Sequence, residues 1–219
     1  MSPANAEQRV RNAGLVPVVA LPTPTIAVPL AEALLRGGLD LIEITFRTAG
    51  AAQAISDIRD QLPEMLAGAG TITSPEQALA ASDAGAQFGV APGLNRSVVA
   101  AADDAGLPFW PGVTTPSEIE TALAAGHRLL KYFPAEAMGG IGTIKALLGP
   151  YRHLGVEFIP TGGINAELAP SYWRVLGIAA IGGSWIAPHQ LLVDAAWEKI
   201  EQLTRTAVAA RTQAIAETR

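Results

Sequence analysis

Apolar residues follow two alternating patterns along this chain. Short apolar runs, many of them followed by Gly or Pro, alternate with longer segments in which apolar residues recur at helical spacing. The short runs predict buried β-strands at residues 16–21, 39–46, 65–69, 86–90, 108–110, 128–132, 156–159 and 178–181.

The longer segments predict helices before the first strand, between most of the strands and after the last one. Two of them begin with clear start signals. Ser74 is followed by Pro75 and then by Gln77, the pattern of a capping box, and Thr115 precedes Pro116 in the same way. The predicted helices cover residues 5–12, 26–37, 51–62, 75–85, 95–105, 116–126, 141–148 and 191–217.

Eight strands that alternate with helices imply a parallel sheet. Eight such units suit a (β/α)8 barrel, the TIM barrel, as a single domain over residues 1–219 with an extra N-terminal helix. A doubly wound open sheet is the alternative, but the strand count and the Gly-rich turns at strand ends favour the barrel. In such a barrel, catalytic residues lie at the C-terminal ends of the strands.

Composition narrows the possible functions. Hydrophobic residues make up 49% of the 219 residues, which is enough for a large core in one domain. The net charge of -5 and the lack of a basic patch argue against a nucleic-acid partner. No apolar run approaches the ~20 residues of a membrane span. The N-terminal segment lacks a signal-peptide pattern, so we expect a cytoplasmic protein.

The residues that usually hold metals are scarce. The chain has no cysteine, which excludes disulfides, thiolate metal sites and a thiol nucleophile. His127, His153 and His189 do not have the spacing of metal ligands. We therefore expect neither a metal nor another cofactor.

Lys131 has an unusual setting for a charged residue. It lies in the run HRLLKYFPAE, directly after two leucines and before two aromatic residues. Apolar surroundings disfavour an ammonium group and favour the free amine, which can attack a carbonyl carbon to form a Schiff base. The alternative is a strand-end lysine whose ammonium group reaches water past its apolar stem.

The strand predicted at residues 39–46 carries polar residues near its C-terminal end. Alternation places Glu43, Thr45 and Arg47 on one face and the apolar residues between them on the other. In a barrel the polar face points inward, where a largely desolvated Glu43 would suit proton transfer. The same alternation points Lys131 inward. A purely structural ion pair of Glu43 with Arg47 or Lys131 is the alternative.

Three further strand ends carry candidate binding groups. Thr71 follows the third strand, and its hydroxyl either contacts a substrate or serves a turn or helix cap. The last two strands end in Thr161-Gly162-Gly163 and Gly182-Gly183-Ser184. Backbone N–H groups of such glycine pairs can cradle an anion, and these loops are the usual phosphate site of a barrel. Ordinary tight turns are the alternative.

Several segments together resemble the 2-keto-3-deoxy-6-phosphogluconate (KDPG) aldolase family, which also includes aldolases for 4-hydroxy-2-oxoglutarate (KHG) and for the phosphogalactonate epimer. They occur in order between Leu15 and Ile186: GGLDLIEITFRT, GAGTITSPEQ, GAQFGVAPGL, PGVTTPSEIETALAAGH, LKYFPAEAMGG, PTGGI and GGSWI.

The resemblance implies a class I aldolase, a homotrimeric barrel enzyme that needs no metal. Such an enzyme is a carbon–carbon lyase that reversibly cleaves a phosphorylated 2-keto acid, KDPG, to pyruvate and glyceraldehyde 3-phosphate. Two other readings of the residues remain open. One is a phosphate-binding isomerase in which Lys131 acts only as a charge, and the other is a non-catalytic ligand-binding barrel.

The resemblance also implies a role for each matching residue. Lys131 corresponds to the Schiff-base lysine, and Glu43 to an acid/base that works through a bound water. The substrate-binding residues would be Arg47 and Thr71 at the pyruvate carboxylate, with Pro92, Phe133 and Thr161 in the pocket. The phosphate-binding residues would be Gly162, Gly163, Gly183 and Ser184.

The chain departs from the family after its first strand. Many members carry a basic residue there, close to the distal end of the substrate, whereas this chain reads ALPTP at residues 20–24. Phosphate binding is therefore expected to be weaker, or the acceptor aldehyde to differ.

Overall fold

The computed structural model describes residues 3–217 and has an α/β fold in which the named strands pair in parallel. One sheet has the strand order β5-β4-β3-β2-β1-β9, and a second has the order β6-β7-β8. The strands are β1 Leu15–Val19, β2 Leu41–Thr45, β3 Leu66–Gly70, β4 Gly89–Val90, β5 Phe109–Trp110, β6 Gly112–Val113, β7 Leu129–Tyr132, β8 Glu157–Pro160 and β9 Ile181–Gly183.

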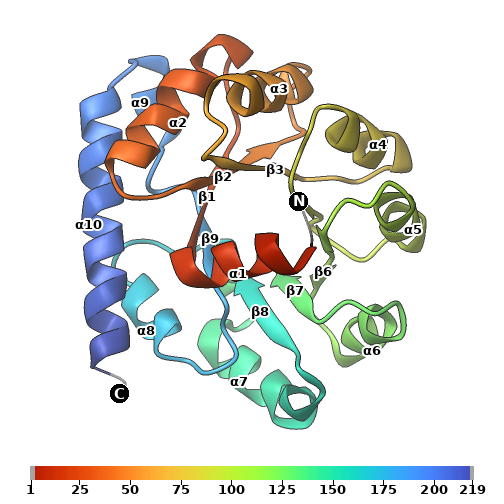
Figure 1. Ribbon diagram of the computed structural model, residues 1–219. Coiled ribbons are helices and arrows are strands. Elements are labelled where there is room, and N and C mark those ends of the chain that lie inside the picture. The colour runs from red at the N-terminus through yellow and green to blue at the C-terminus, as the bar shows by residue number, and fades with distance from the viewer. Residues whose placement is uncertain (1–2, 218–219) are drawn as a thin grey trace.

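Helices surround the strands (Figure 1), and α1 lies across one end of them. This end holds the N-termini of the strands, because β1 begins directly after α1. The α-helices are α1 Pro3–Ala13, α2 Ala27–Arg36, α3 Ala51–Gln61, α4 Pro75–Asp83, α5 Arg96–Asp104, α6 Pro116–Ala124, α7 Gly140–Tyr151, α8 Ala169–Trp173, α9 His189–Val193 and α10 Trp197–Ala216, and the 3-10 helices are η1 Pro24–Ile26, η2 Glu136–Met138 and η3 Arg152–Leu154.

The two sheets meet at both of their edges. Strand β5 pairs with β4 and the adjacent β6 pairs with β7. Pro111 separates these two strands, because proline has no N–H group to give to a ladder. At the other edge, isolated parallel bridges join Phe158 to Ile178 and Thr161 to Gly182. The alternation of strands and helices and the parallel pairing are as predicted.

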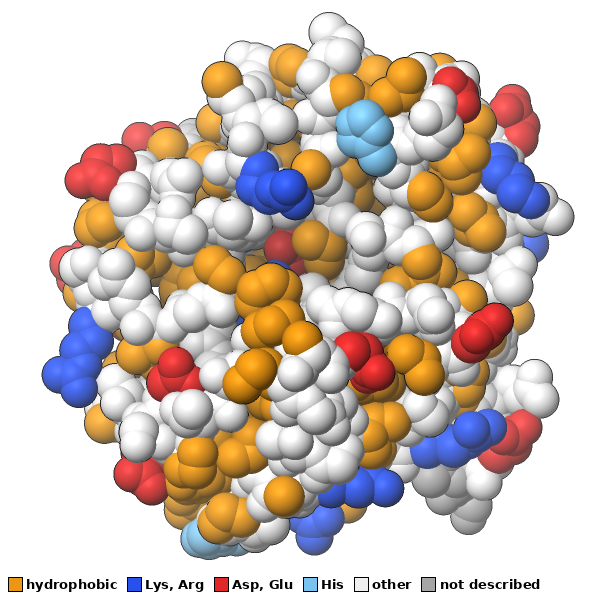
Figure 2. Space-filling view, turned by 180° about the vertical axis from the view of Figure 1, so that it is seen from behind, with side chains coloured by type: hydrophobic (Ala, Val, Ile, Leu, Met, Phe, Trp, Pro, Cys, Tyr) orange, Lys and Arg blue, Asp and Glu red, His pale blue; other side chains and the backbone are white. Residues whose placement is uncertain are grey.

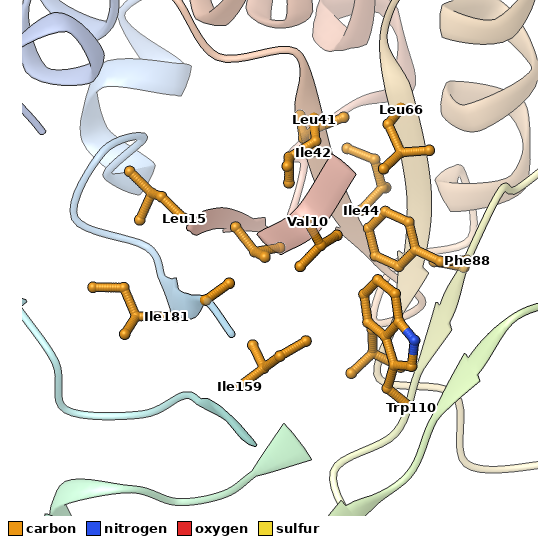
Figure 3. Packing of buried hydrophobic residues seen from close by; sticks show 14 of the residues in the cluster. Val10, Leu15, Leu41, Ile42, Ile44, Leu66, Phe88, Trp110, Ile159 and Ile181 are labelled. Carbon is orange, nitrogen blue, oxygen red and sulfur yellow. The ribbon is translucent and has the colours of Figure 1, made fainter. Parts of the chain in front are cut away.

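Apolar side chains from distant parts of the chain form one core (Figure 3). The cluster combines Val10 of α1, Leu15 of β1 and Ile181 of β9, each of them fully buried. Phe88 stacks on Trp110 with ring centroids 4.6 Å apart. The first helix and the last strand therefore contribute to the same interior.

The C-terminal part differs from the sequence prediction in three places. The eighth predicted strand, 178–181, is wrong in position, because Ile178 makes only an isolated bridge and β9 is Ile181–Gly183. Helix α8, Ala169–Trp173, was not predicted. The predicted helix 191–217 is two helices, α9 and α10, because Ala195 adopts a positive φ of 50° between them.

Candidate active site

Two ionisable side chains lie together in the interior. Glu43 in β2 is 2% exposed and Lys131 in β7 is 4% exposed. Lys131 Nζ donates a hydrogen bond to Glu43 Oε1 across 3.3 Å. The alternative in which the Lys131 ammonium group reaches water is therefore wrong. Glu43 pairs with Lys131 and not with Arg47.

Neighbouring strands fix the place of this pair. Glu43 and Thr45 share the inner face of β2, as strand alternation requires. Thr45 lies in register with Gly70 of β3, and a Cβ atom at Gly70 would overlap Glu43 Oε1. Lys131 lies in register with Gly112 of β6. The absence of a side chain at Gly70 on β3 thus leaves room for the Glu43 carboxylate.

The buried Glu43–Lys131 ion pair contributes little to the stability of the fold, but its two groups can exchange a proton. Desolvation of two buried charges offsets much of their mutual attraction, so a buried ion pair adds little net stability. Lys131 Nζ also lies 5.5 Å from the centroid of the Phe133 ring, whose π face attracts a cation. Proton transfer from Lys131 to Glu43 would leave an amine and a carboxylic acid, which are the groups needed to attack a carbonyl.

A buried tyrosine supports the loop that follows the lysine strand. Burial raises the pKa of Tyr132, so its hydroxyl stays protonated at neutral pH. This hydroxyl donates a hydrogen bond to the backbone oxygen of Met138 across 2.7 Å. The bond fixes the turn that leads from β7 past Phe133 into η2.

A cleft of about 630 Å³ opens at the C-terminal ends of the strands. Figure 2 shows this face, opposite α1, hollowed near its centre with acidic side-chain atoms deep in the hollow. Thr45 and Phe133 line the cleft. Thr45 lies two residues beyond Glu43 at the end of β2, and Phe133 lies two residues beyond Lys131, directly after β7. The pair therefore lies one layer below them. Most of the predicted site residues line the cleft: Arg47, Phe133, Thr161, Gly162, Gly163, Gly183 and Ser184.

Both predicted glycine loops reach this cleft. Gly162 and Gly163 have positive φ values of 104° and 82°, a conformation that other residues rarely adopt. Ser184 is exposed beside Gly183 in the second loop. The loop after β8 and the loop before α9 thus both line this cleft.

Thr71 and Pro92 lie outside the set of residues that line the cleft. Thr71 has a φ of 56°, which is an outlier for a β-branched residue and marks local strain. It does not cap α4, because Ser74 fills that position and accepts from the Gln77 N–H. Pro92 packs against β6, where a Cβ atom at Gly112 would overlap its carbonyl group.

The cleft lining also includes two polar residues without a predicted role, Thr45 and His189. Thr45 lies between Glu43 and Arg47 on one strand face, which was a usable signal. His189 begins α9, five residues after Ser184, and its sequence spacing indicates no function. Only the three-dimensional structure shows that His189 lines the cleft.

Residues 3–217 contain no group of three His, Asp or Glu side chains placed to hold a metal ion. None of the helices in this range combines the length and the hydropathy that a membrane crossing requires.

The family model for KDPG and KHG aldolases matches residues 6–203. The chain belongs to this family. A family member from Haemophilus influenzae, named 2-dehydro-3-deoxy-phosphogluconate aldolase, is 42% identical over 201 residues, which are 92% of this chain and 94% of that protein.

Solved structures of family members have the same fold. KDPG aldolase from Legionella pneumophila, with pyruvate captured at low pH as a covalent carbinolamine intermediate, aligns with a TM-score of 0.88 and 35% identity over 92% of this chain and 97% of that one. The Zymomonas mobilis ZM4 enzyme with 3-phosphoglycerate aligns with a TM-score of 0.86 and 33% identity over 95% and 97% of the two chains.

Proposed function

We propose that this protein is a class I aldolase that reversibly cleaves KDPG into pyruvate and glyceraldehyde 3-phosphate. One observation carries the proposal: a lysine amine and a carboxylate are buried 3.3 Å apart beneath a cleft. The covalent carbinolamine of pyruvate in the Legionella relative supports it, because such an adduct needs an amine nucleophile.

The first half of the reaction builds an electron sink on Lys131. Glu43 accepts a proton from the Lys131 ammonium group, and the free amine adds to the C2 keto carbon of the substrate to give a carbinolamine. Loss of water then gives an iminium. Glu43 is within reach to return a proton to the departing hydroxyl, because its Oε1 already contacts Lys131 Nζ.

The second half breaks the C3–C4 bond. Glu43, acting through a bound water, takes the proton of the C4 hydroxyl, the C3–C4 electron pair moves into the iminium, and glyceraldehyde 3-phosphate leaves. The remaining enamine takes a proton at C3, and hydrolysis of the iminium releases pyruvate and restores Lys131. A positioned acid/base of this kind is worth roughly 10²–10⁴-fold in rate.

The resemblance to the family suggests which residues would bind each part of the substrate. Arg47, Phe133 and Thr161 line the cleft, and they would bind the carboxylate (Arg47) and bound the reacting carbons (Phe133 and Thr161). Thr71 and Pro92, which are not among the lining residues, would have to assist at the carboxylate and at the reacting carbons from just outside the cleft. The phosphate would lie against the glycine loops, which offer backbone N–H groups and one serine hydroxyl. The loop residues are Gly162, Gly163, Gly183 and Ser184, all of which line the cleft.

A related substrate is the second candidate. Ala20 lines the cleft directly after β1. The resemblance to the family implies a basic residue in this segment, and this chain has none there. A shorter keto acid, 4-hydroxy-2-oxoglutarate, carries no phosphate, because its distal group is a carboxylate bonded to C4, and the family includes KHG aldolases. The phosphogalactonate epimer is a further alternative. Initial rates with the three substrates, measured as pyruvate release, distinguish them.

We infer one domain in which the two sheets close into a single (β/α)8 barrel, supported by the shared segment of β5 and β6 and by the bridges from β8 to the β9 region. From the resemblance to the family we infer a homotrimer, and we propose a cytoplasmic location. Light scattering would give the mass, and a monomer would contradict the trimer.

Borohydride trapping tests the function. Reduction in the presence of pyruvate should add a pyruvate-derived mass to one peptide, the one that contains Lys131. Lys131→Met should abolish the label and the turnover, while Lys145→Met, which changes an exposed lysine of α7, should change neither. Labelling at Lys145 or Lys199, or no labelling, would refute the Schiff-base assignment and favour an isomerase or a binding protein.

A further inference from the structure

The hydroxyl of Thr45 is buried without a hydrogen-bond partner. Thr45 is the last residue of β2 and only 3% exposed. Its Oγ1 is shielded from solvent and makes no hydrogen bond within residues 3–217. The side chain nevertheless lines the catalytic cleft, on the strand face that carries Glu43.

A threonine at this position costs stability unless a ligand uses its hydroxyl. Valine has nearly the same shape, suits a strand equally well and brings no polar atom into the interior. Buried polar groups in folded proteins almost always have partners, and an orphan at an active site is explained when its partner arrives with the substrate.

Chain order shows which part of a substrate would meet this hydroxyl. On the inner face of β2, Glu43 lies deepest beside Lys131 Nζ, and Thr45 follows it. Arg47, in the turn after the strand, is exposed at the mouth of the same cleft. In a 2-keto acid, the carboxylate is bonded directly to the carbon that Lys131 attacks. With the keto carbon at Lys131 Nζ, the substrate carboxylate therefore lies between the buried Glu43–Lys131 pair and Arg47, at the depth of Thr45.

We propose that Thr45 Oγ1 donates a hydrogen bond to the substrate carboxylate and, together with the cationic Arg47, holds the keto carbon over Lys131 Nζ. This inference rests on the proposed Schiff-base function. It makes Thr45 a binding residue for the pyruvate part of every substrate and predicts no role at the phosphate end.

Reductive trapping with two ketones tests the contact. Pyruvate and acetone both present a keto carbon to Lys131, but acetone has no carboxylate. In Thr45→Val, half-saturation of trapping by pyruvate should shift upward by about 10- to 100-fold, the effect of losing a hydrogen bond to a charged group. Trapping by acetone should not change. Thr45→Ser keeps the hydroxyl and should saturate with pyruvate close to the wild type.

Thermal unfolding separates this role from a structural one. Thr45→Val removes an orphaned hydroxyl, so its melting temperature should equal or exceed that of the wild type. The matched control is Thr204→Val, because buried Thr204 Oγ1 donates to the Ile200 carbonyl oxygen at 2.7 Å within α10. That variant should melt lower and trap pyruvate normally.

Each contrary outcome has its own meaning. Unchanged pyruvate saturation in Thr45→Val would overturn the contact while leaving the Schiff base intact. Equal losses with pyruvate and acetone would place the hydroxyl at the keto carbon and also overturn it. Failure of the wild type to trap pyruvate at all would refute the proposed function itself, and the Thr45 contact with it.

Discussion

Gly70 and Glu43 are complementary in space. A Cβ atom on Gly70 would overlap Oε1 of Glu43, the oxygen that accepts the hydrogen bond from Lys131. The two residues come from adjacent strands, β3 and β2, in a region where both strands are fully buried. The place of the proposed acid/base thus depends on a residue that has no functional group of its own.

We expect Gly70→Ala to push the Glu43 carboxylate away from Lys131 and to lower the turnover number by ~10²-fold, the usual effect of misplacing a reacting group by about 1 Å. Pyruvate release at saturating substrate measures it. Gly142→Ala in α7 is the control, because a Cβ atom there meets no other atom within 4 Å. Equal activity of the two variants would show that the carboxylate tolerates displacement.

Glu43→Gln separates proton transfer from packing. Glutamine keeps the shape of the side chain but cannot take up a proton, so turnover should fall by ~10²-fold or more. Pyruvate should still form an iminium at Lys131, visible as the reduced adduct by mass spectrometry. If turnover stays at the wild-type level, Glu43 is only a structural partner of the lysine.

The inward direction of Glu43 and Lys131 could be predicted from the sequence, but their pairing could not. Alternation along an uninterrupted strand was enough to point Glu43 and Lys131 inward. The partner of Glu43 remained open, because Arg47 lies on the same face and Lys131 is 88 residues away in the chain. Folding decides between them, since Arg47 lies at the solvent-exposed mouth.

Other features left no sequence signal. The segment between α9 and α10 contains neither Gly nor Pro, so apolar periodicity runs through it although Ala195 breaks the helix. The positive φ of Thr71 is equally hidden, because threonine is a residue that disfavours it. Local sequence patterns predict where helices and strands lie. Unusual backbone conformations such as those of Ala195 and Thr71 can be found only in the structure.

The start of α6 provides a test of stability against pH. Partial burial raises the pKa of Glu118, but hydrogen bonds from Thr114 and Thr115 outweigh this effect and lower the pKa below its ordinary value of 4.5. The Thr114 and Thr115 N–H groups each donate to Glu118 Oε2 at 2.8 Å, completing a capping box.

Because the folded state favours the ionised carboxylate, Glu118 stabilises the protein fully above pH 4.5 and loses this contribution as the pH falls through the lowered pKa. Glu118→Gln should therefore melt below the wild type at pH 7, and the gap should narrow toward pH 3. Melting curves at both pH values check this. A gap that is constant with pH would mean that charge plays no part in the cap.

Ser184 provides the cleanest test of the phosphate end. Its exposed hydroxyl lines the cleft beside Gly183. Ser184→Ala should raise KM for KDPG several-fold, the effect of losing one solvent-exposed hydrogen bond of about 1 kcal/mol. KM for 4-hydroxy-2-oxoglutarate should not change, because that substrate has no phosphate to bind.

Gly163→Val acts on the same subsite more severely. A Cβ atom at Gly163 would lie 2.6 Å from Glu136 Cβ, and its φ of 82° strains any branched residue, so the variant must first be shown to be folded by its melting curve. In folded protein, the added side chain should keep the phosphate from the backbone N–H groups. Cleavage of KDPG should then fall far more than cleavage of 4-hydroxy-2-oxoglutarate. Equal losses with both substrates, in this variant and in Ser184→Ala, would mean that the glycine pairs are only tight turns and that the phosphate binds elsewhere.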